Sequence, residues 1–231
     1  MELSKRLKAV ADLVSEGRVV ADVGTDHGYI PIYLLETKKC RKAFAMDVNA
    51  GPLERAKEHI TAYGLSDAIE TRLSDGVTAL SAGECDCVVI AGMGGALTIK
   101  IMEEGKSIFQ NLKEFVLQPQ SELSKVRQYL CENGYVVIAE DMVLEDGKFY
   151  PMMKVTNGRS PEYNTIELRY GKYLLEQKHP VLKEFLKKEV QVKGLIMQNL
   201  DAQSGAHIEA RKAELSRELA EVKEAICFVE R

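Results

Sequence analysis

The chain has 231 residues, of which 45% are hydrophobic and 29% are charged, a balance that excludes an intrinsically disordered or collagen-like protein. Its formal net charge of −4 does not by itself indicate nucleic-acid binding, although a small basic patch can lie on an acidic surface. No apolar run approaches the roughly 20 residues of a membrane helix, and the charged N-terminal residues lack the apolar stretch of a signal peptide, so we expect a cytoplasmic protein.

The first part of the chain alternates between helical and strand patterns. Apolar residues at helical spacing predict an amphipathic helix over residues 3–14, and the β-branched run Arg18–Val23 predicts a strand buried on both faces. Repeated strand–helix units at this spacing are typical of a parallel, doubly wound sheet. The further expected strands cover residues 43–47, 69–73, 85–91 and 115–117, and the expected helices cover residues 30–37, 53–63, 97–104 and 121–132.

The pattern changes after Gly134. Residues 135–144 and 149–155 have the composition of strands, and the connection Glu145-Asp-Gly-Lys148 contains the Asp-Gly pair that is typical of a β-hairpin turn. The expected fold class is therefore α/β, with a doubly wound, mostly parallel, Rossmann-like sheet that carries an antiparallel edge hairpin.

A turn-rich segment, Thr156–Pro161, precedes a purely helical region, so we predict one domain over residues 1–157 and a second over residues 158–231. The apolar spacing of the second domain predicts a helical hairpin with coiled-coil-like packing and a turn near residues 201–205. The expected contact residues are Leu175, Leu182, Phe185, Val192 and Ile196 on the first helix and Leu215, Leu219, Val222, Ile226 and Val229 on the second.

Cysteine and histidine spacing gives no sign of a metal site. The five cysteines and four histidines form no CxxC pair and no HExxH motif. Cys85 and Cys87 would face the same side of a strand, which does not favour a shared zinc ion. We expect reduced thiols packed as small apolar groups, and no metal.

The most informative segment is the turn after the first strand. Glycine at a strand–helix turn lets the backbone approach a ligand closely. A single Gly-x-x-x-Gly turn is a weak signal, because many α/β proteins need a tight turn at this place. The segment reads Asp22-Val-Gly24-Thr-Asp26-His27-Gly28.

Acidic residues at the ends of three successive strands strengthen the interpretation of this turn as a ligand site. Asp47 lies 19 residues past Gly28, where an acidic side chain binds the ribose hydroxyls of a nucleoside cofactor. Asp75 closes the third strand within Ser74-Asp-Gly76, a common position for an acid that contacts an adenine amino group. Ordinary helix capping is the alternative role for Asp22, Asp47 and Asp75.

Two cofactor classes compete for this site. The dinucleotide site of an oxidoreductase uses Gly-x-Gly-x-x-Gly so that a pyrophosphate lies on a helix N-terminus. Here Asp26 replaces the second glycine, and its carboxylate would repel a pyrophosphate. S-adenosylmethionine has no phosphate and carries a sulfonium and an ammonium, which suit an aspartate. The residues favour S-adenosylmethionine, and a nucleotide-dependent oxidoreductase stays the alternative.

Further candidates follow the fourth and fifth strands. The segment Ile90–Gly95, Ile-Ala-Gly-Met-Gly-Gly, either exposes backbone groups to a reacting base or forms a tight turn at a helix N-terminus. The segment Leu117–Gln120 could supply amide contacts to a base edge. The basic run Lys38–Lys42 is either a phosphate contact or an exposed connection.

Together these motifs resemble the bacterial tRNA (adenine-22-N1)-methyltransferase family. The resemblance covers the α/β domain, and the two-helix tail matches the coiled-coil-like C-terminal domain of that family. It implies a class I S-adenosylmethionine-dependent methyltransferase that modifies N1 of adenine 22 in the D arm of tRNA. The segments that carry the resemblance are Asp22–Pro31, Gly51-Pro52, Ser74–Gly76, Ile90–Gly95 and Leu117–Pro119.

Site residues are assigned with this resemblance. The helical domain is expected to position tRNA, and dimerisation through its apolar seam is the alternative role. We expect the chain to be a monomer or weak dimer. We expect catalytic roles for Asp26, Gly92 and Met93, and substrate contacts from Arg6, Tyr29, Gln118 and Pro119. Tyr29 and His27 are candidates to stack on the target base, and core packing is the alternative role for Tyr29. Donor binding is expected from Asp22, Gly24, Asp26, His27, Gly28, Asp47, Val48, Asp75, Gly76 and Gly92.

The residues after the fourth strand favour a ring nitrogen as the methylated atom. Methyltransferases that act on exocyclic amines carry Asn/Asp-Pro-Pro-Tyr at this place, whereas this chain has Ala91-Gly-Met-Gly94. Positioning would supply most of the catalysis, and Asp26 or a backbone carbonyl near Gly92 could stabilise the cationic product. A non-catalytic RNA-binding protein on the same fold is the second alternative.

Overall fold

The computed structural model describes residues 1–201, 203 and 205–231, and the chain divides into two compact units, Met1–Glu162 and Tyr163–Arg231. The division lies five residues beyond the boundary predicted at residue 157. Residues 158–162 stay with the first unit because Gly158 N donates to Gly134 O at 2.9 Å and Ser160 Oγ lies 3.2 Å from Cys131 Sγ.

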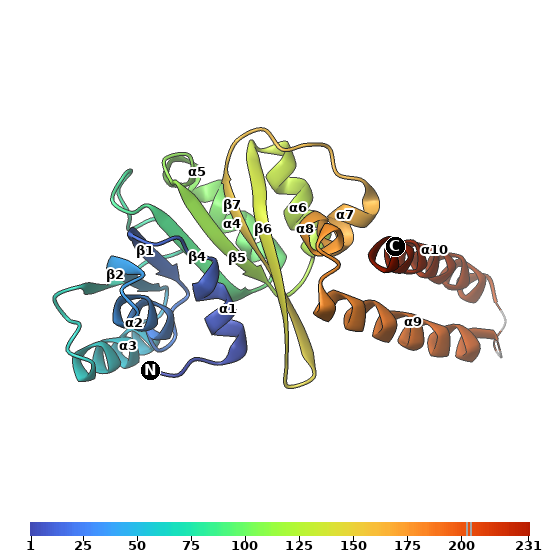
Figure 1. Cartoon of the computed structure of the whole chain (residues 1–231), viewed down its shortest axis with the longest axis horizontal. Helices are drawn as coiled ribbons and strands as arrows, with labels where there is room; N and C mark the ends of the chain where they lie inside the picture. Colours follow the sequence, from blue (N-terminus) through green and yellow to red (C-terminus); the bar gives the residue numbers. More distant parts are fainter. Residues whose placement is uncertain (202, 204) are drawn as a thin grey trace. The chain divides into compact units, whose positions relative to one another are not determined.

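A seven-stranded sheet forms the centre of the first unit (Figure 1). Its strands are β1 (Arg18–Val23), β2 (Cys40–Asp47), β3 (Ile69–Leu73), β4 (Cys87–Met93), β5 (Glu114–Pro119), β6 (Tyr135–Glu145) and β7 (Lys148–Asn157). Their spatial order is β3-β2-β1-β4-β5-β7-β6, in which β3 to β5 are parallel and the last two pairs are antiparallel. The predicted mostly parallel sheet with an antiparallel edge hairpin is confirmed.

The Asp-Gly turn forms the hairpin as predicted. Asp146 and Gly147 both have positive φ angles, 49° and 74°, which is the requirement of the type I′ turn between Glu145 and its partner Lys148. The later strand of the hairpin, β7, is inserted between β5 and β6, so β6 forms the edge of the sheet.

Helices cover both faces of the sheet (Figure 1). On one face lie α1 (Lys5–Leu13), α2 (Tyr29–Glu36) and α3 (Ala50–Ala62), and α1 buries Ala9, Val10 and Ala11. On the other face lie α4 (Gly95–Glu104), α5 (Lys106–Phe109) and α6 (Leu123–Glu132). The strand predicted over residues 85–91 is observed two residues later, so Gly92 and Met93 belong to β4 itself.

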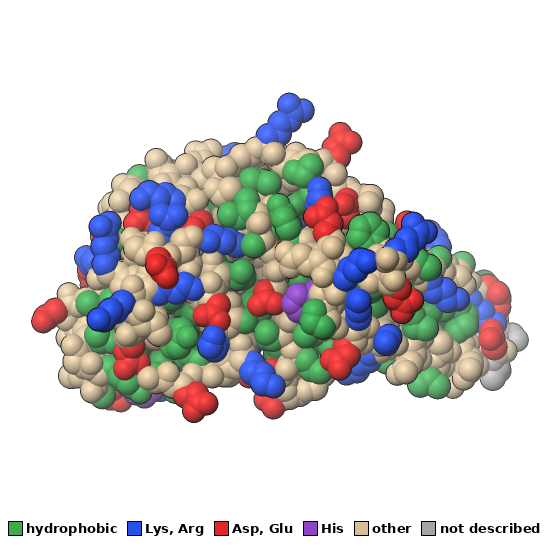
Figure 2. All heavy atoms as spheres, viewed as in Figure 1, with side chains coloured by type: hydrophobic (Ala, Val, Ile, Leu, Met, Phe, Trp, Pro, Cys, Tyr) green, Lys and Arg blue, Asp and Glu red, His purple; other side chains and the backbone are tan. Residues whose placement is uncertain are grey.

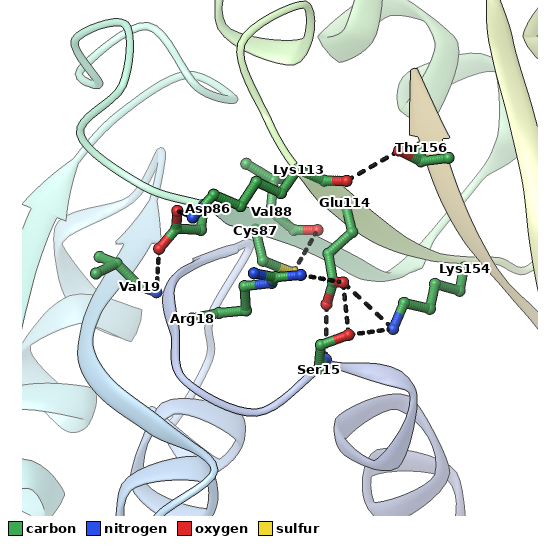
Figure 3. Close-up of polar contacts among 10 residues, drawn as sticks. All are labelled: Ser15, Arg18, Val19, Asp86, Cys87, Val88, Lys113, Glu114, Lys154 and Thr156. Atoms are coloured by element: carbon green, nitrogen blue, oxygen red, sulfur yellow. Dashed lines mark hydrogen bonds and ion pairs between the residues drawn. The ribbon is translucent and has the colours of Figure 1, made fainter. Parts of the chain in front are cut away.

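A buried carboxylate anchors the C-terminal end of α1 to the sheet (Figure 3). Glu114 has a side chain that is 4% exposed; it accepts hydrogen bonds from Ser15 N at 2.6 Å and Ser15 Oγ at 2.7 Å. Arg18 and Lys154 each form an ion pair with Glu114 at 3.3 Å. Burial alone would raise the pKa of Glu114, but these hydrogen bonds and the charge of Lys154 outweigh burial and keep that pKa below its ordinary value. The segment that follows α1 is thus tied through Ser15 to Glu114 of β5 and Lys154 of β7.

The described residues of the second unit form helices and short connections, with no strand among them. It contains α7 (Thr165–Tyr170), α8 (Lys172–Glu176), α9 (Pro180–Asp201) and α10 (Ala206–Glu230). The expected turn over residues 201–205 includes Ala202 and Ser204, which lie outside the described residues. Within this unit α9 packs against α10, and the buried positions are Leu182 and Leu186 on α9 and Ile208, Leu215, Val222, Ala225 and Val229 on α10.

The apolar stripe predicted for the first helix of this hairpin is wrong in its second half. Val192 is 45% exposed and Ile196 is 37% exposed, so neither belongs to the contact seam. Lys193, one position along, instead forms ion pairs with Glu189 at 3.2 Å and Glu218 at 2.6 Å. The inward-facing side of α9 therefore changes from apolar to charged along its length.

Candidate functional site

The carboxyl ends of β1 and β4 meet at the point where the strand order reverses. Val23 of β1 pairs with Ile90 of β4, while the chain continues outward from β1 to β2 and from β4 to β5. Open α/β sheets bind ligands at this switch point. A pocket of about 290 Å³ lies here, lined by Arg6, Leu7, Asp22, Gly24, Thr25, Asp26, His27, Tyr29, Ile30, Ala91, Gly92 and Gln120.

Seven of the predicted site residues meet at this pocket, which we call the switch-point pocket. They are Arg6, Asp22, Gly24, Asp26, His27, Tyr29 and Gly92. The other predicted residues do not line it. Gly28 is the N-cap of α2, Met93 packs over Gly24, and Gln118 and Pro119 lie in β5. Asp47 ends β2, Val48 follows it, and Asp75 and Gly76 follow β3.

Gly24 has a conformation and a space that exclude a side chain. Its φ angle is +78°, in the left-handed region, and a Cβ atom at this position would overlap Cε of Met93. The backbone is held by hydrogen bonds from Gly24 N and Thr25 N to Met46 O, at 2.8 and 2.9 Å. The turn is therefore tied to the end of β2, and its backbone remains uncovered on the pocket side.

Asp22 is the buried acid of the pocket. It is 5% exposed, and burial raises its pKa to about 6, an increase to which the negative charge of Asp47 contributes. A buried carboxylate with a raised pKa gains most from a cationic ligand, because a nearby positive charge favours its ionised form.

Two buried polar atoms around the carboxyl ends of the strands have no partner in the described part of the chain. They are His27 Nδ1 and Gln118 Nε2. Buried polar groups in folded proteins are nearly always hydrogen-bonded, so unpaired groups beside a pocket are suited to a polar ligand. Together with the carboxylates of Asp22 and Asp26, these atoms fit a ligand that carries an ammonium and several hydrogen-bonding groups.

The carboxylate of Asp26 already has two partners within the protein, Arg55 and His27. Its carboxylate accepts a short hydrogen bond from Arg55 of α3, and His27 Nε2 lies 3.2 Å from its other oxygen. The hydrogen bond from Arg55 keeps the pKa of Asp26 below its ordinary value. Sequence reasoning missed Arg55, although the helix after β2 starts at the same sheet edge as the pocket.

Three stacked rings stand beside the pocket. His27 and Tyr29 have ring centroids 5.0 Å apart with planes 12° from parallel, and Tyr29 and His59 are 5.5 Å apart with planes 10° from parallel. A neighbouring pocket of about 500 Å³ shares Leu7 and Tyr29 with the switch-point pocket and is also lined by His59 and Tyr63. The predicted role of Tyr29 in stacking is compatible with this place, and His59 joins it although no sequence motif marked that residue.

The ends of β2 and β3 adjoin this site. Asp47 Oδ1 accepts a hydrogen bond from Asn49 N at 2.8 Å, and Ser74 N donates to Asp47 O at 2.9 Å. Val48 and Asp75 are exposed. The ends of β2 and β3 therefore continue from the turn after β1, and the exposed side chains of Val48 and Asp75 are accessible to a ligand that extends beyond the pocket.

Gln118 and Pro119 differ from the expectation of direct contact with a base. Both side chains are buried within β5, and Gln118 is 0% exposed. Gln118 Oε1 accepts hydrogen bonds from Gly92 N at 3.1 Å and Arg6 Nη1 at 3.0 Å. Gln120, which follows these residues, lines the pocket instead.

The charged surface gives no simple indication of a partner. On the face drawn in Figure 2, acidic and basic side chains are interspersed rather than separated into patches. Within the described ranges, His, Cys, Asp and Glu side chains form no group of three or more that could hold a metal ion. No helix in these ranges has the length and apolar character needed to span a membrane.

The fold and the strand-end site define a methyltransferase domain, and the family model with that description matches residues 3–153. The tRNA (adenine(22)-N(1))-methyltransferase of Bacillus subtilis (strain 168) is 37% identical over 196 residues, which are 83% of this chain and 81% of the relative. The chain belongs to the tRNA (adenine(22)-N(1))-methyltransferase family.

Solved structures of related proteins match this fold over nearly the whole chain. The crystal structure of the B. subtilis tRNA methyltransferase TrmK has a TM-score of 0.86 at 30% identity, with 97% of this chain and 99% of that chain covered. The Streptococcus pneumoniae protein Sp1610 in complex with S-adenosyl-L-methionine has a TM-score of 0.88 at 31% identity, with 97% and 100% covered.

Proposed function

We propose that this protein transfers a methyl group from S-adenosylmethionine to N1 of adenine 22 in tRNA. The observation that carries the proposal is the switch-point pocket, which combines the buried carboxylate of Asp22 with the uncovered backbone of Gly24. It occurs in a chain that aligns over 83% of its length with a tRNA (adenine(22)-N(1))-methyltransferase.

The strand ends supply groups for each part of the donor. S-adenosylmethionine supplies an electrophilic methyl group on its sulfonium. Asp22 binds the ammonium, since a buried carboxylate gains most from a cation. Asp47 binds the ribose hydroxyls and Asp75 the adenine amino group, each at the end of its strand. The further donor contacts are assigned to Gly24, Asp26, His27, Gly28, Val48, Gly76 and Gly92.

Adenine N1 requires positioning more than proton transfer. Its lone pair lies in the plane of the base and is already nucleophilic, so no general base is assigned. Gly92 and Met93 end β4 beside the pocket and shape the place of the base, and Tyr29 stacks on it. Asp26 stabilises the positive charge of the methylated adenine, with its carboxylate oriented by Arg55.

The substrate must present an accessible adenine. N1 lies on the Watson–Crick edge, so adenine 22 is unpaired or flipped when it reaches the pocket. Residues 1–157 are assigned donor binding and catalysis, and the helical residues 158–231 are assigned the positioning of tRNA. The protein acts in the cytoplasm as a monomer or weak dimer.

One experiment tests the assignment. The full chain is incubated with labelled S-adenosylmethionine and two unmodified tRNA transcripts that differ only in adenine or guanine at position 22. We expect 1-methyladenosine in the first transcript alone, measured by mass spectrometry after digestion at neutral pH so that the base does not rearrange. Formation of N6-methyladenosine or of any methylated cytidine would contradict the assignment to N1.

A further inference from the structure

Arg6 carries a charge that no side chain in the described part of the molecule neutralises. Among the described residues it forms no ion pair with a carboxylate; Nη1 donates to Gln118 Oε1 at 3.0 Å, and the guanidinium lies 5.5 Å from the ring centroid of Tyr150. Arg6 also lines the switch-point pocket, and a Cβ atom on Gly92 would lie 3.4 Å from its Nη1. A guanidinium has five donor hydrogens, so most of them remain for a ligand.

Gln118 holds this guanidinium with a neutral group. Its Oε1 also accepts a hydrogen bond from Gly92 N at 3.1 Å, and these two donors define which end of the amide is the oxygen. The side chain is fully buried, and Nε2 has no partner in the described residues. A buried amide with an unpaired nitrogen is unfavourable, so packing alone does not explain a glutamine here.

The choice of an amide has an electrostatic consequence. A glutamate at position 118 would hold Arg6 equally well but would cancel its charge, whereas a glutamine orients the guanidinium and leaves the charge for a ligand. Guanidinium groups bind carboxylates and phosphates through paired hydrogen bonds.

We propose that Arg6 binds an oxyanion at the switch-point pocket and that Gln118 is a positioning residue that orients Arg6 against the backbone of Gly92. The proposal rests on the proposed function for the identity of the oxyanion. It is either the carboxylate of the donor's amino-acid part or a backbone phosphate of the RNA at the methylated nucleotide.

Measurements with two small ligands and with tRNA distinguish the donor carboxylate from an RNA phosphate. S-adenosylhomocysteine contains the carboxylate, and 5′-methylthioadenosine lacks the amino-acid part. If Arg6 binds the donor carboxylate, Arg6→Gln lowers the affinity for S-adenosylhomocysteine at least tenfold in calorimetry and leaves the affinity for 5′-methylthioadenosine unchanged. If an RNA phosphate is bound, both affinities stay unchanged, KM for tRNA rises at least tenfold, and the salt dependence of tRNA binding decreases by about one phosphate contact. Values within twofold of the unmodified protein in all three measurements would overturn the proposal.

Lys8→Gln is the matched control for charge. Lys8 lies on the same helix, is exposed and pairs with Asp12 at 2.6 Å, so this variant removes one positive charge without touching the pocket. Its ligand affinities and KM are expected to equal those of the unmodified protein.

A double-mutant cycle between Gln118 and Arg6 tests the role of Gln118. Gln118→Glu and Gln118→Met should change the same measured quantity as Arg6→Gln, and adding either to Arg6→Gln should cause little further change. Thermal unfolding of each variant accompanies the binding data. Additive effects, or changes in melting temperature without a change in ligand affinity or KM, would show that Gln118 is only structural.

The proposed function can fail independently. If the unmodified protein forms no 1-methyladenosine in tRNA, the methylation assignment is wrong, but S-adenosylhomocysteine binding by Arg6 variants still measures the carboxylate site. If 1-methyladenosine forms and the Arg6 variants behave as the unmodified protein, only the oxyanion proposal is wrong.

Discussion

The side chain of Met93 fills the space directly above Gly24, so that a Cβ atom on Gly24 would overlap its Cε. Gly24 directly follows β1 and Met93 ends the neighbouring strand β4, and their contact sets how close a ligand can come to the turn after β1. Gly24→Ala should therefore displace Met93 and strain a backbone with φ of +78°.

We expect Gly24→Ala to weaken S-adenosylhomocysteine binding at least tenfold and to lower the melting temperature, with both measured on the same preparation. Gly17→Ala is the matched control, because Gly17 has φ of +75° but open space around it. In that variant backbone strain alone should lower the free energy of unfolding by about 1–3 kcal/mol, and ligand affinity should stay unchanged. Equal effects of the two substitutions on affinity would exclude a role for the Met93 contact.

Asp22→Asn should separate stability from binding. The folded protein raises the pKa of Asp22 from 3.8 to about 6, so it binds the proton more tightly than the unfolded chain, and stability falls as pH rises from about 4 to 6. A shift of two pKa units corresponds to about 3 kcal/mol at neutral pH. We expect the variant to gain up to that amount in denaturant unfolding at pH 7 and to lose this pH dependence.

The same variant should lose donor affinity. In the unmodified protein, affinity for S-adenosylmethionine should fall about tenfold per pH unit below pH 6 as Asp22 becomes protonated. Calorimetry between pH 5 and 8 checks this profile, which should be flat and weak in Asp22→Asn. A pH-independent affinity in the unmodified protein would remove Asp22 from the ammonium site.

Asp47→Ala should weaken S-adenosylmethionine at least tenfold while the fold survives. The expected loss is that of a charge-assisted hydrogen bond to the ribose, about 1.5–3 kcal/mol. Asp67→Ala is the charge-matched control, because Asp67 is exposed in the connection that precedes β3, far from its carboxyl end. Unchanged calorimetric affinity in Asp47→Ala would remove this residue from the donor site.

Tyr29→Ala should affect RNA more than the donor. Stacking of a base on an aromatic ring contributes about 1–3 kcal/mol, so KM for tRNA should rise about tenfold or more. S-adenosylhomocysteine affinity should change less than twofold. Tyr29→Phe keeps the ring and should behave as the unmodified protein in steady-state kinetics; a defect in this variant would indicate a role of the hydroxyl instead of stacking.

Removal of the helical unit should separate donor binding from RNA recognition. A chain that ends at Glu162 keeps all of β7, including Asn157, whose Nδ2 donates to Phe109 O and Leu112 O at 3.0 Å each. We expect it to bind S-adenosylmethionine normally and to methylate tRNA poorly. Full activity on tRNA would show that the helical unit is dispensable for recognition.

The sequence predicted those parts of the fold that depend on local patterns. Asp146-Gly147 marked the hairpin because only a few residue pairs adopt two successive positive φ angles. The acids and glycines that follow β1 to β4 marked the site because strand ends in a parallel sheet share one edge. The place of β7 between β5 and β6 had no local signal, since strand order depends on contacts between distant segments.

Contacts between distant segments also explain what was missed at the site. Arg55 reaches Asp26 from α3 across 29 positions, and Arg6 reaches Gln118 across 112. Gln118 lies in a short apolar strand, where its burial could be expected but its two hydrogen-bond donors could not. For Val192, apolar spacing alone predicted burial, whereas Lys193 and its two ion pairs occupy the seam.

The insertion of β7 between β5 and β6 has a consequence during synthesis. Glu114–Pro119 leaves the ribosome well before its second neighbour, and this edge stays unpaired until Lys148–Asn157 has been made and has folded back alongside it. An apolar strand with an open edge is a template for pairing with another chain. Nascent chains that end between these two strands are therefore the species expected to aggregate or to require a chaperone, whereas chains released after the hairpin has closed are protected.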